Sequence, residues 1–148
     1  MPQTCLCIDL RSAAQRLTQA YDQALLPAGI TVTQFSQLHL IRTLEGPTLT
    51  QLSDASQLDR STLGRNIRVL EKQGLVRTQP GADARTRTVH LTSEGDRTFQ
   101  RAVPLWYGAQ SELLNRLGND GRNQLDDLLT TLTAPLSANQ DTTQAPSL

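Results

Sequence analysis

A short stretch of the chain, LDRSTLGRNIRVLEKQGL at residues 58–75, carries basic side chains at helical intervals. Its cations are Arg60, Arg65, Arg68 and Lys72. On a helix with about 100° per residue, Leu63, Ile67 and Leu70 fall within about 60° of one another, and the cations occupy an arc of about 140° away from them. The pattern predicts a helix that is buried on its apolar side and presents cations to a polyanion.

Double-stranded DNA is a polyanion that suits this arrangement. An α-helix fits the major groove of B-DNA, where residues near the helix N-terminus can read base edges and arginine can pair with guanine. Ser61 and Gly64 are small and lie within the basic arc, so the backbone could approach the groove closely. We expect base contacts from Ser61, Thr62 and Arg65. Phosphate contacts are expected from Arg60, Arg68 and Lys72.

The distribution of charge agrees with this interpretation, although the formal net charge of the 148 residues is zero. Residues 59–101 contain nine basic and five acidic residues, whereas the remainder contains five basic and nine acidic ones. A basic middle segment with acidic flanks indicates a polyanion partner for the middle alone. A solvated charged face without a partner is the alternative.

Apolar periodicity predicts the helices that position this segment. The expected helices are residues 6–26, residues 33–44 with Thr33 as the N-cap, a short helix after Thr48, and residues 59–73 with Asp59 as the N-cap. Only a few residues separate the last two, which predicts a tight helix-turn-helix.

Alternation of apolar and polar residues then predicts a β-hairpin with strands LVRTQ at 75–79 and RTVHL at 87–91. Arg85, in the link between the strands, and Arg87 could reach the adjacent minor groove of DNA. The two basic elements together favour DNA contact over a merely solvated face.

The C-terminal third returns to helix. Thr92 or Ser93 caps a helix that runs toward Leu117 with a kink expected at Pro104, and two glycines precede a last helix that ends near Leu136. Residues 137–148 have nothing to bury and are expected to be disordered. The chain length fits a single domain, and the fold class is mainly α with a small β-hairpin.

The stretch LDRSTLGRNIRVLEKQGLVRTQPGADARTRTVHLTSEG resembles the MarR family of winged helix-turn-helix transcription regulators, and the similarity extends over about residues 6–135. The resemblance implies a DNA-binding lobe at about 33–101 and dimerisation helices at 6–26 and 102–136. It further implies a homodimer on a pseudo-palindromic operator, most often a repressor that a small molecule releases. Asp83 would brace the wing and Arg85 would enter the minor groove.

Three positions depart from the family pattern in the first helix of the motif and its turn. Ser53 stands where alanine is usual, Ser56 where an aliphatic residue is usual, and Gln57 where glycine is common. We expect this helix to be packed less firmly, with its register kept.

The N-terminal segment LCIDLRSAAQRLTQAYDQAL is similar to the organic-peroxide-sensing branch of the family. The similarity assigns a reactive thiol to Cys7 and a supporting tyrosine to Tyr21, with Arg11 where the branch has a second tyrosine. A cation one turn from Cys7 would favour its thiolate, and an organic peroxide would convert that thiolate to a sulfenic acid that Cys5 or another thiol resolves. The alternatives are a buried, inert cysteine and a soft-metal site at the Cys-x-Cys pair.

Other functions find less support in the sequence. There is no Ser-His-Asp spacing, Gly-rich phosphate loop or metal-ligand cluster, so we expect neither an enzyme nor a cofactor. A thiol-based, peroxidase-like enzyme and a protein-interaction module on a helix-turn-helix scaffold remain as alternatives. No apolar run is long enough for a membrane span and no secretory signal precedes the first helix, so a cytoplasmic location is expected.

Overall fold

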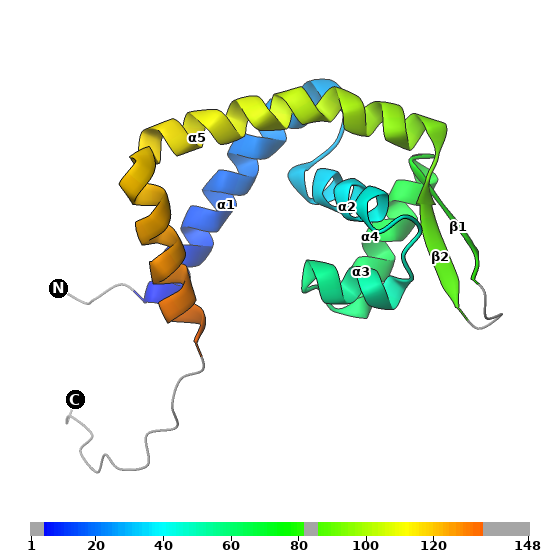
Figure 1. Cartoon of the computed structure of the whole chain (residues 1–148), viewed down its shortest axis with the longest axis horizontal. Coiled ribbons are helices and arrows are strands. Elements are labelled where there is room, and N and C mark those ends of the chain that lie inside the picture. Colours follow the sequence, from blue (N-terminus) through cyan, green and yellow to red (C-terminus); the bar gives the residue numbers. More distant parts are fainter. Residues whose placement is uncertain (1–4, 82–85, 135–148) are drawn as a thin grey trace, which may run out of the picture. The chain divides into compact units, whose positions relative to one another are not determined.

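A computed structural model describes residues 5–81 and 86–134 (Figure 1). The elements, in chain order, are α1 (Leu6–Leu25), the short 3₁₀ helix η1 (Leu26–Ala28), α2 (Val32–Thr43), α3 (Leu49–Ser56), α4 (Arg60–Lys72), β1 (Val76–Pro80), β2 (Arg87–Leu91) and α5 (Ser93–Thr133). The predicted mainly α fold with one hairpin is confirmed. The chain divides within α5 into two compact units, one up to Gln110 and one from Ser111 onward. The tail at 137–148 lies outside the described residues.

Two helices begin with the same reciprocal hydrogen bonds. Thr31 Oγ1 accepts from Gln34 N at 3.3 Å, and Gln34 Oε1 accepts from Thr31 N at 3.0 Å. Thr48 and Gln51 repeat this capping box at the start of α3. The prediction that Thr33 caps the second helix is therefore wrong, because Thr31 is the threonine with a glutamine three residues later.

The core of the first unit is built from aliphatic side chains of α2, α3, α4 and β2. Its fully buried members include Leu38, Ile41, Leu52, Leu63, Leu70 and Val89. Leu44, at the C-cap of α2, is by contrast 43% exposed. The helix-turn-helix and the hairpin thus share one core.

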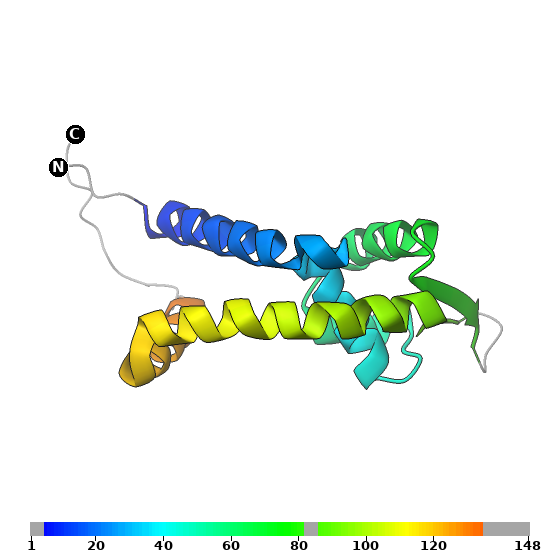
Figure 2. The same cartoon turned by 90° about the horizontal axis from the view of Figure 1, so that it is seen from above.

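The hairpin is antiparallel, with Val76 opposite Leu91 and Pro80 opposite Arg87. Its second strand is also joined to the turn before α3. Val89 N donates to Pro47 O at 2.9 Å, and Thr48 forms an isolated bridge with Thr88. The wing is therefore fixed along this edge to the helix-turn-helix. Figure 2 shows the same hairpin between the end of α4 and the start of α5.

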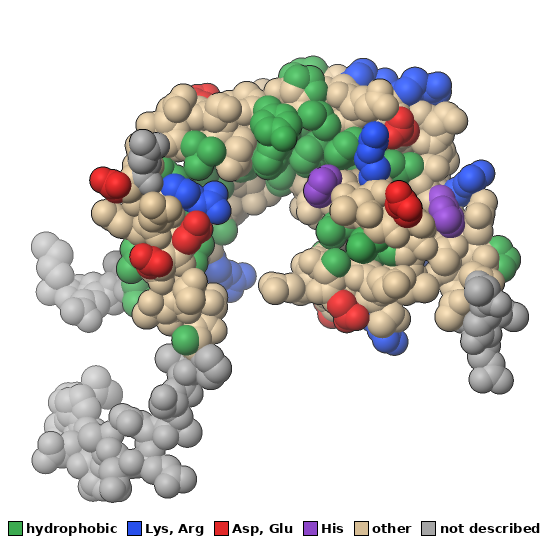
Figure 3. Space-filling view, viewed as in Figure 1, with side chains coloured by type: hydrophobic (Ala, Val, Ile, Leu, Met, Phe, Trp, Pro, Cys, Tyr) green, Lys and Arg blue, Asp and Glu red, His purple; other side chains and the backbone are tan. Residues whose placement is uncertain are grey.

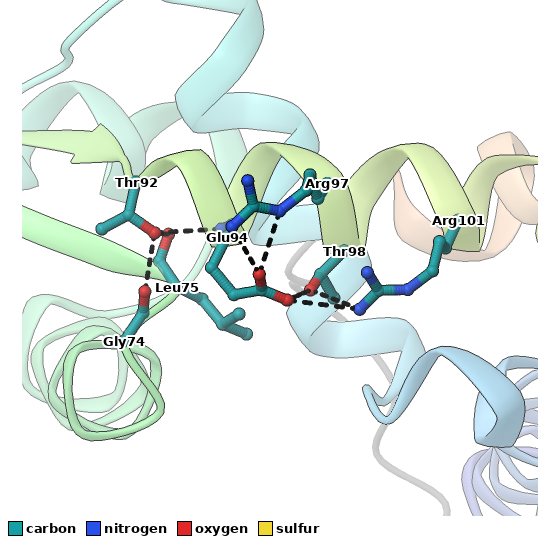
Figure 4. A network of polar contacts seen from close by, with 8 residues as sticks. Gly74, Leu75, Thr92, Glu94, Arg97, Thr98 and Arg101 are labelled. Carbon is teal, nitrogen blue, oxygen red and sulfur yellow. Dashed lines mark hydrogen bonds and ion pairs between the residues drawn. The ribbon is translucent and has the colours of Figure 1, made fainter.

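Thr92 connects the end of α4 to the start of α5 (Figure 4). Its hydroxyl donates to Gly74 O at 2.6 Å and accepts from Gly95 N at 2.9 Å, while its N–H donates to Leu75 O at 3.0 Å. Two residues later, the pKa of the Glu94 carboxyl is lowered, chiefly by the hydrogen bond from Arg97. The first turn of α5 is therefore tied to the residues that follow α4.

Within α5, Gly118 has φ 68° and ψ 174°, so the helix is interrupted there. Figure 1 shows the change of direction in the yellow to orange part of the ribbon. The interruption expected at Gly118 is confirmed, whereas the backbone at Pro104 keeps helical dihedral angles.

We expect Gly95→Ala to destabilise the fold by about 1–3 kcal/mol, because a Cβ there would lie 1.9 Å from the Leu75 carbonyl oxygen. Gly108→Ala, in the same helix, is the matched control, since no atom lies within 4 Å of its Cβ. That change should raise the free energy of unfolding by up to about 1 kcal/mol. Urea unfolding followed by circular dichroism measures both, and equal effects would contradict the close approach at Gly95.

Candidate nucleic-acid interface

Helix α4 is held by the apolar side that the sequence predicted. Leu63, Ile67 and Leu70 are 1%, 3% and 0% exposed. The side chains of Arg60, Arg65, Arg68 and Lys72 are all exposed. Burying three aliphatic side chains stabilises the fold by roughly 1.5–3 kcal/mol each, so this orientation of the helix is strongly favoured.

Asp59 caps the N-terminus of α4, as predicted. Its carboxylate accepts from Thr62 N at 2.8 Å and from Thr62 Oγ1 at 2.6 Å. The hydrogen bonds from Thr62, side chain first and backbone second, lower the pKa of Asp59 to about 2. The hydroxyl proton of Thr62, one of the proposed base readers, is therefore already used by the N-cap.

Arg65 and Ser61 lie together on the exposed side of α4. Arg65 Nε donates to Ser61 O and Arg65 Nη2 donates to Ser61 Oγ, both at 3.3 Å. These bonds are long and solvent-exposed, so water or a base edge can replace them at small cost. The structure thus brings two of the predicted base readers to one place.

The cations of α4 have no acidic partners in the described chain. Within residues 5–81 and 86–134, no carboxylate forms an ion pair with Arg60, Arg65, Arg68 or Lys72. Arg97 and Arg101, by contrast, both contact Glu94 on α5. A set of unpaired cations on a fixed helix is a suitable electrostatic surface for phosphates.

The turn between α3 and α4 accommodates the unusual residues noted in the sequence. Gln57 adopts a left-handed conformation with φ 56°, where a glycine would be unstrained. Ser53 Oγ donates to Leu58 O at 2.6 Å across the turn, and Leu52 is 1% exposed. The register of α3 is therefore kept, as expected, because the hydroxyl bridges the turn and Leu52 keeps its core contact, and the looser packing of this helix stays a prediction.

The wing is described only in part. Arg87 is exposed, and its Nη2 donates to Thr78 Oγ1 on the neighbouring strand at 2.9 Å. Asp83 and Arg85 lie outside the described residues, so their assigned roles stay predictions.

The N-terminal redox residues are not brought together within one chain. Cys5 and Cys7 are exposed and unbridged, and Arg11 lies one turn from Cys7 on α1. Tyr21 is fourteen residues beyond Cys7, roughly 21 Å along the helix, and its hydroxyl donates to the side chain of Gln110. Any contact between Cys7 and a Tyr21 hydroxyl therefore requires a second subunit.

A cavity of about 470 Å³ between α2 and the first half of α5 was not predicted from the sequence. Four of the five aromatic side chains in the protein line it. Phe35 stacks on Phe99 and on Trp106, with ring centroids 5.2 and 5.6 Å apart. The guanidinium of Arg42 lies 5.4 Å from the centre of the Phe99 ring. Figure 3 shows hydrophobic side chains gathered along this part of α5.

Within residues 5–81 and 86–134, no group of three or more His, Cys, Asp or Glu side chains could hold a metal ion. None of the described helices is long and apolar enough to cross a membrane.

A family profile, related sequences and similar solved structures agree with one another in the comparison with known proteins. A profile of the MarR family matches residues 28–86. The transcriptional regulator HosA of Escherichia coli O127:H6 is 30% identical over 109 residues, 73% of this chain and 79% of HosA. The M. tuberculosis transcriptional regulator MosR in complex with DNA is 41% identical, with a TM-score of 0.77 over 88% of this chain and 98% of that one. A variant of E. coli MarR complexed with operator DNA is 26% identical, with a TM-score of 0.79 over 86% and 93%.

A helix-turn-helix followed by a β-hairpin, with exposed cations on its second helix, is the arrangement of the winged helix-turn-helix class. The related proteins HosA and MosR, within this class, are transcriptional regulators. The chain belongs to the MarR family of transcriptional regulators.

We expect Asp59→Ala to lower the free energy of unfolding at neutral pH, because Thr62 N loses its acceptor. The pKa of Asp59 in the folded chain is about 2, below its usual value of 3.8. The carboxylate therefore stabilises the folded state fully at a pH above 3.8, and this stabilisation is lost as the pH falls through about 2. Chemical denaturation from neutral pH downward should therefore show the variant and the native chain converging. Asp54→Ala controls for the loss of one exposed carboxylate, and a pH-independent difference at Asp59 would contradict the cap.

Proposed function

We propose that this chain is a homodimeric, sequence-specific DNA-binding repressor. The observation that carries the proposal is the set of cations on α4 that form no ion pair among the described residues, on a helix whose opposite side is buried. MosR in complex with DNA and MarR complexed with operator DNA are solved examples of similar folds on DNA. We further propose a cytoplasmic location, because such a regulator acts on DNA.

The proposed contacts follow the geometry of α4 and the wing. Ser61 and Arg65 read base edges in the major groove, with Thr62 restricted to contacts that leave its bond to Asp59 intact. Arg60, Arg68 and Lys72 bind phosphates. Arg85 enters the minor groove, braced by Asp83, and Arg87 lies at the root of the same wing.

Dimerisation has support in both compact units. In α1, Leu6 and Ile8 are 65% and 61% exposed, and in the last part of α5, Leu128 is 59% exposed with Leu125, Leu129 and Leu132 also exposed. Single exposed leucines are ordinary, but helices that expose several of them mark association surfaces. A second copy of the chain is the occupant we propose for these helices.

Release from DNA has two candidate triggers. A small molecule in the aromatic cavity would act if it bound the DNA-competent and released states unequally. Stacked rings suit a flat aromatic molecule, while the guanidinium of Arg42 beside them is already paired with Asp96. Oxidation of Cys7 is the second trigger, supported by the exposure of its thiol and by Arg11 one turn away.

The alternative functions are less favoured. A thiol-based enzyme agrees poorly with a family and relatives that are transcriptional regulators. A protein-interaction module would not require the cations of α4 to be unpaired, and its binding to DNA would be weak and indifferent to sequence.

DNA binding can be tested by fluorescence anisotropy with the chain's own upstream DNA across a range of salt. Affinity should fall steeply with salt, because each neutralised phosphate adds to the slope. Arg65→Ala should reduce the preference for operator over random DNA about tenfold, and Arg85→Ala should weaken binding to all sequences and lower the salt slope by about one. Arg97→Ala, on α5, is the control. Unchanged binding in both test variants would exclude this placement of the DNA.

The redox trigger can be tested with cumene hydroperoxide. The Cys7 thiolate attacks the peroxide O–O bond, giving a sulfenate at Cys7 and releasing cumyl alcohol. The treated native chain should then leave its operator, whereas Cys7→Ser should stay bound. Cys5→Ser, with mass spectrometry of Cys7, identifies the resolving thiol. Equal release of the native chain and Cys7→Ser would rule out sensing by Cys7.

A further inference from the structure

A carboxylate on α4 holds the outer strand of the wing. Glu71 Oε1 accepts two hydrogen bonds from Thr78 in β1, one from its backbone N at 3.1 Å and one from its hydroxyl at 2.7 Å. Glu71 is half-buried and belongs to the same helix as the proposed DNA-reading side chains. Hydrogen bonds to an ionised acceptor are about twice as strong as neutral ones, so this contact is among the stronger polar links of the wing.

The backbone N–H of Thr78 is available to Glu71 because of the strand register. Thr78 lies opposite Val89, and Val89 N donates away from the hairpin to Pro47 O at 2.9 Å. In an antiparallel ladder, the N–H groups of such a pair both point outward. The wing is therefore held from both edges, by the turn before α3 on one side and by Glu71 of α4 on the other.

The same hydroxyl links the second strand to Glu71. Thr78 Oγ1 donates to Glu71 and accepts from Arg87 Nη2 at 2.9 Å. The relay runs from a guanidinium through a hydroxyl to a carboxylate, and each bond polarises the next in the favourable direction. Arg87, expected as a DNA contact, is thus engaged within the wing in the free chain.

We propose that Glu71 is a positioning residue, which sets the angle between the recognition helix α4 and the wing so that both meet one DNA duplex. The inference rests on the proposed DNA-binding function and extends it to a residue that contacts no DNA. Glu71, Thr78 and Arg87 form this clamp, which holds both strands of the hairpin to α4.

Electrostatics alone predicts the opposite effect of removing Glu71. Deleting a carboxylate from a surface that faces phosphates increases its attraction to DNA. The clamp predicts weaker binding, because a wing that is free to move pays orientational entropy on the duplex. Glu45→Ala is the matched control, since it removes an exposed carboxylate, in the turn after α2, that forms no ion pair within residues 5–81 and 86–134. It should leave affinity unchanged or raise it.

The deciding experiment is a double-mutant cycle of Glu71→Ala and Arg85→Ala, measured by anisotropy on operator DNA across salt. Glu71→Ala should weaken binding about tenfold and lower the salt slope as Arg85→Ala does. In the Arg85→Ala background it should cost less than about twofold, since the contact it positions is already gone. Additive effects, unchanged affinity or tighter binding would overturn the proposal.

Two further variants keep the test decisive if Glu71→Ala unfolds. Thr78→Val removes the hydroxyl from the relay but keeps a β-branched strand residue, and should weaken binding several-fold, whereas Thr78→Ser should bind as the native chain does.

Hydrogen exchange of the Thr78 amide gives a readout without DNA, since Glu71→Ala should accelerate it at least about tenfold. If the native chain binds no DNA, the proposed function fails, and this exchange rate still decides whether the clamp exists. An unchanged rate would overturn it.

Discussion

The burial of one side of α4 is the constraint on which the rest of the structure depends. Leu63, Ile67 and Leu70 are essentially inaccessible to solvent, so the helix cannot rotate about its axis without exposing them. The flanks are fixed as well, because Glu71 binds the wing and Gln73 Oε1 accepts from Gln34 Nε2 on α2 at 2.9 Å. The exposed cationic arc of α4 therefore remains available to a partner.

Helix α4 is also connected to the first part of α5, which lines the aromatic cavity where a small molecule would bind. The residues after α4 are bonded to Thr92, and Gly95 approaches Leu75 so closely that no side chain fits between them. One and three turns further along α5, Phe99 and Trp106 line the aromatic cavity. A change of packing in that cavity would therefore act on α5, whose first turn is hydrogen-bonded to the residues that follow α4. Bistable packing of this kind can amplify a small shift.

The sequence predicted those features that depend on neighbours along the chain. The orientation of α4 and its cap at Asp59 follow from local periodicity and one side chain, and both are confirmed. The cap of α2 was misplaced because Thr31 and Thr33 are equally good caps until the partner at Gln34 is considered. The cavity could not be predicted, because Phe35 and Phe99 are far apart in sequence and meet only in the tertiary fold. An unusual share of aromatics in 99–107 was the one available signal.

A formal net charge of zero does not oppose DNA binding by this chain, because the interaction is local. Charges beyond about 8–10 Å are screened at physiological salt, so acidic residues on distant helices act weakly at the α4 surface. The two carboxylates nearest in sequence, Asp59 and Glu71, are both engaged by threonine donors. These carboxylates stabilise the helix start and the wing, while the cations between them form no ion pair with a carboxylate of the described residues. Acidic residues within the motif therefore support the geometry that the basic residues require.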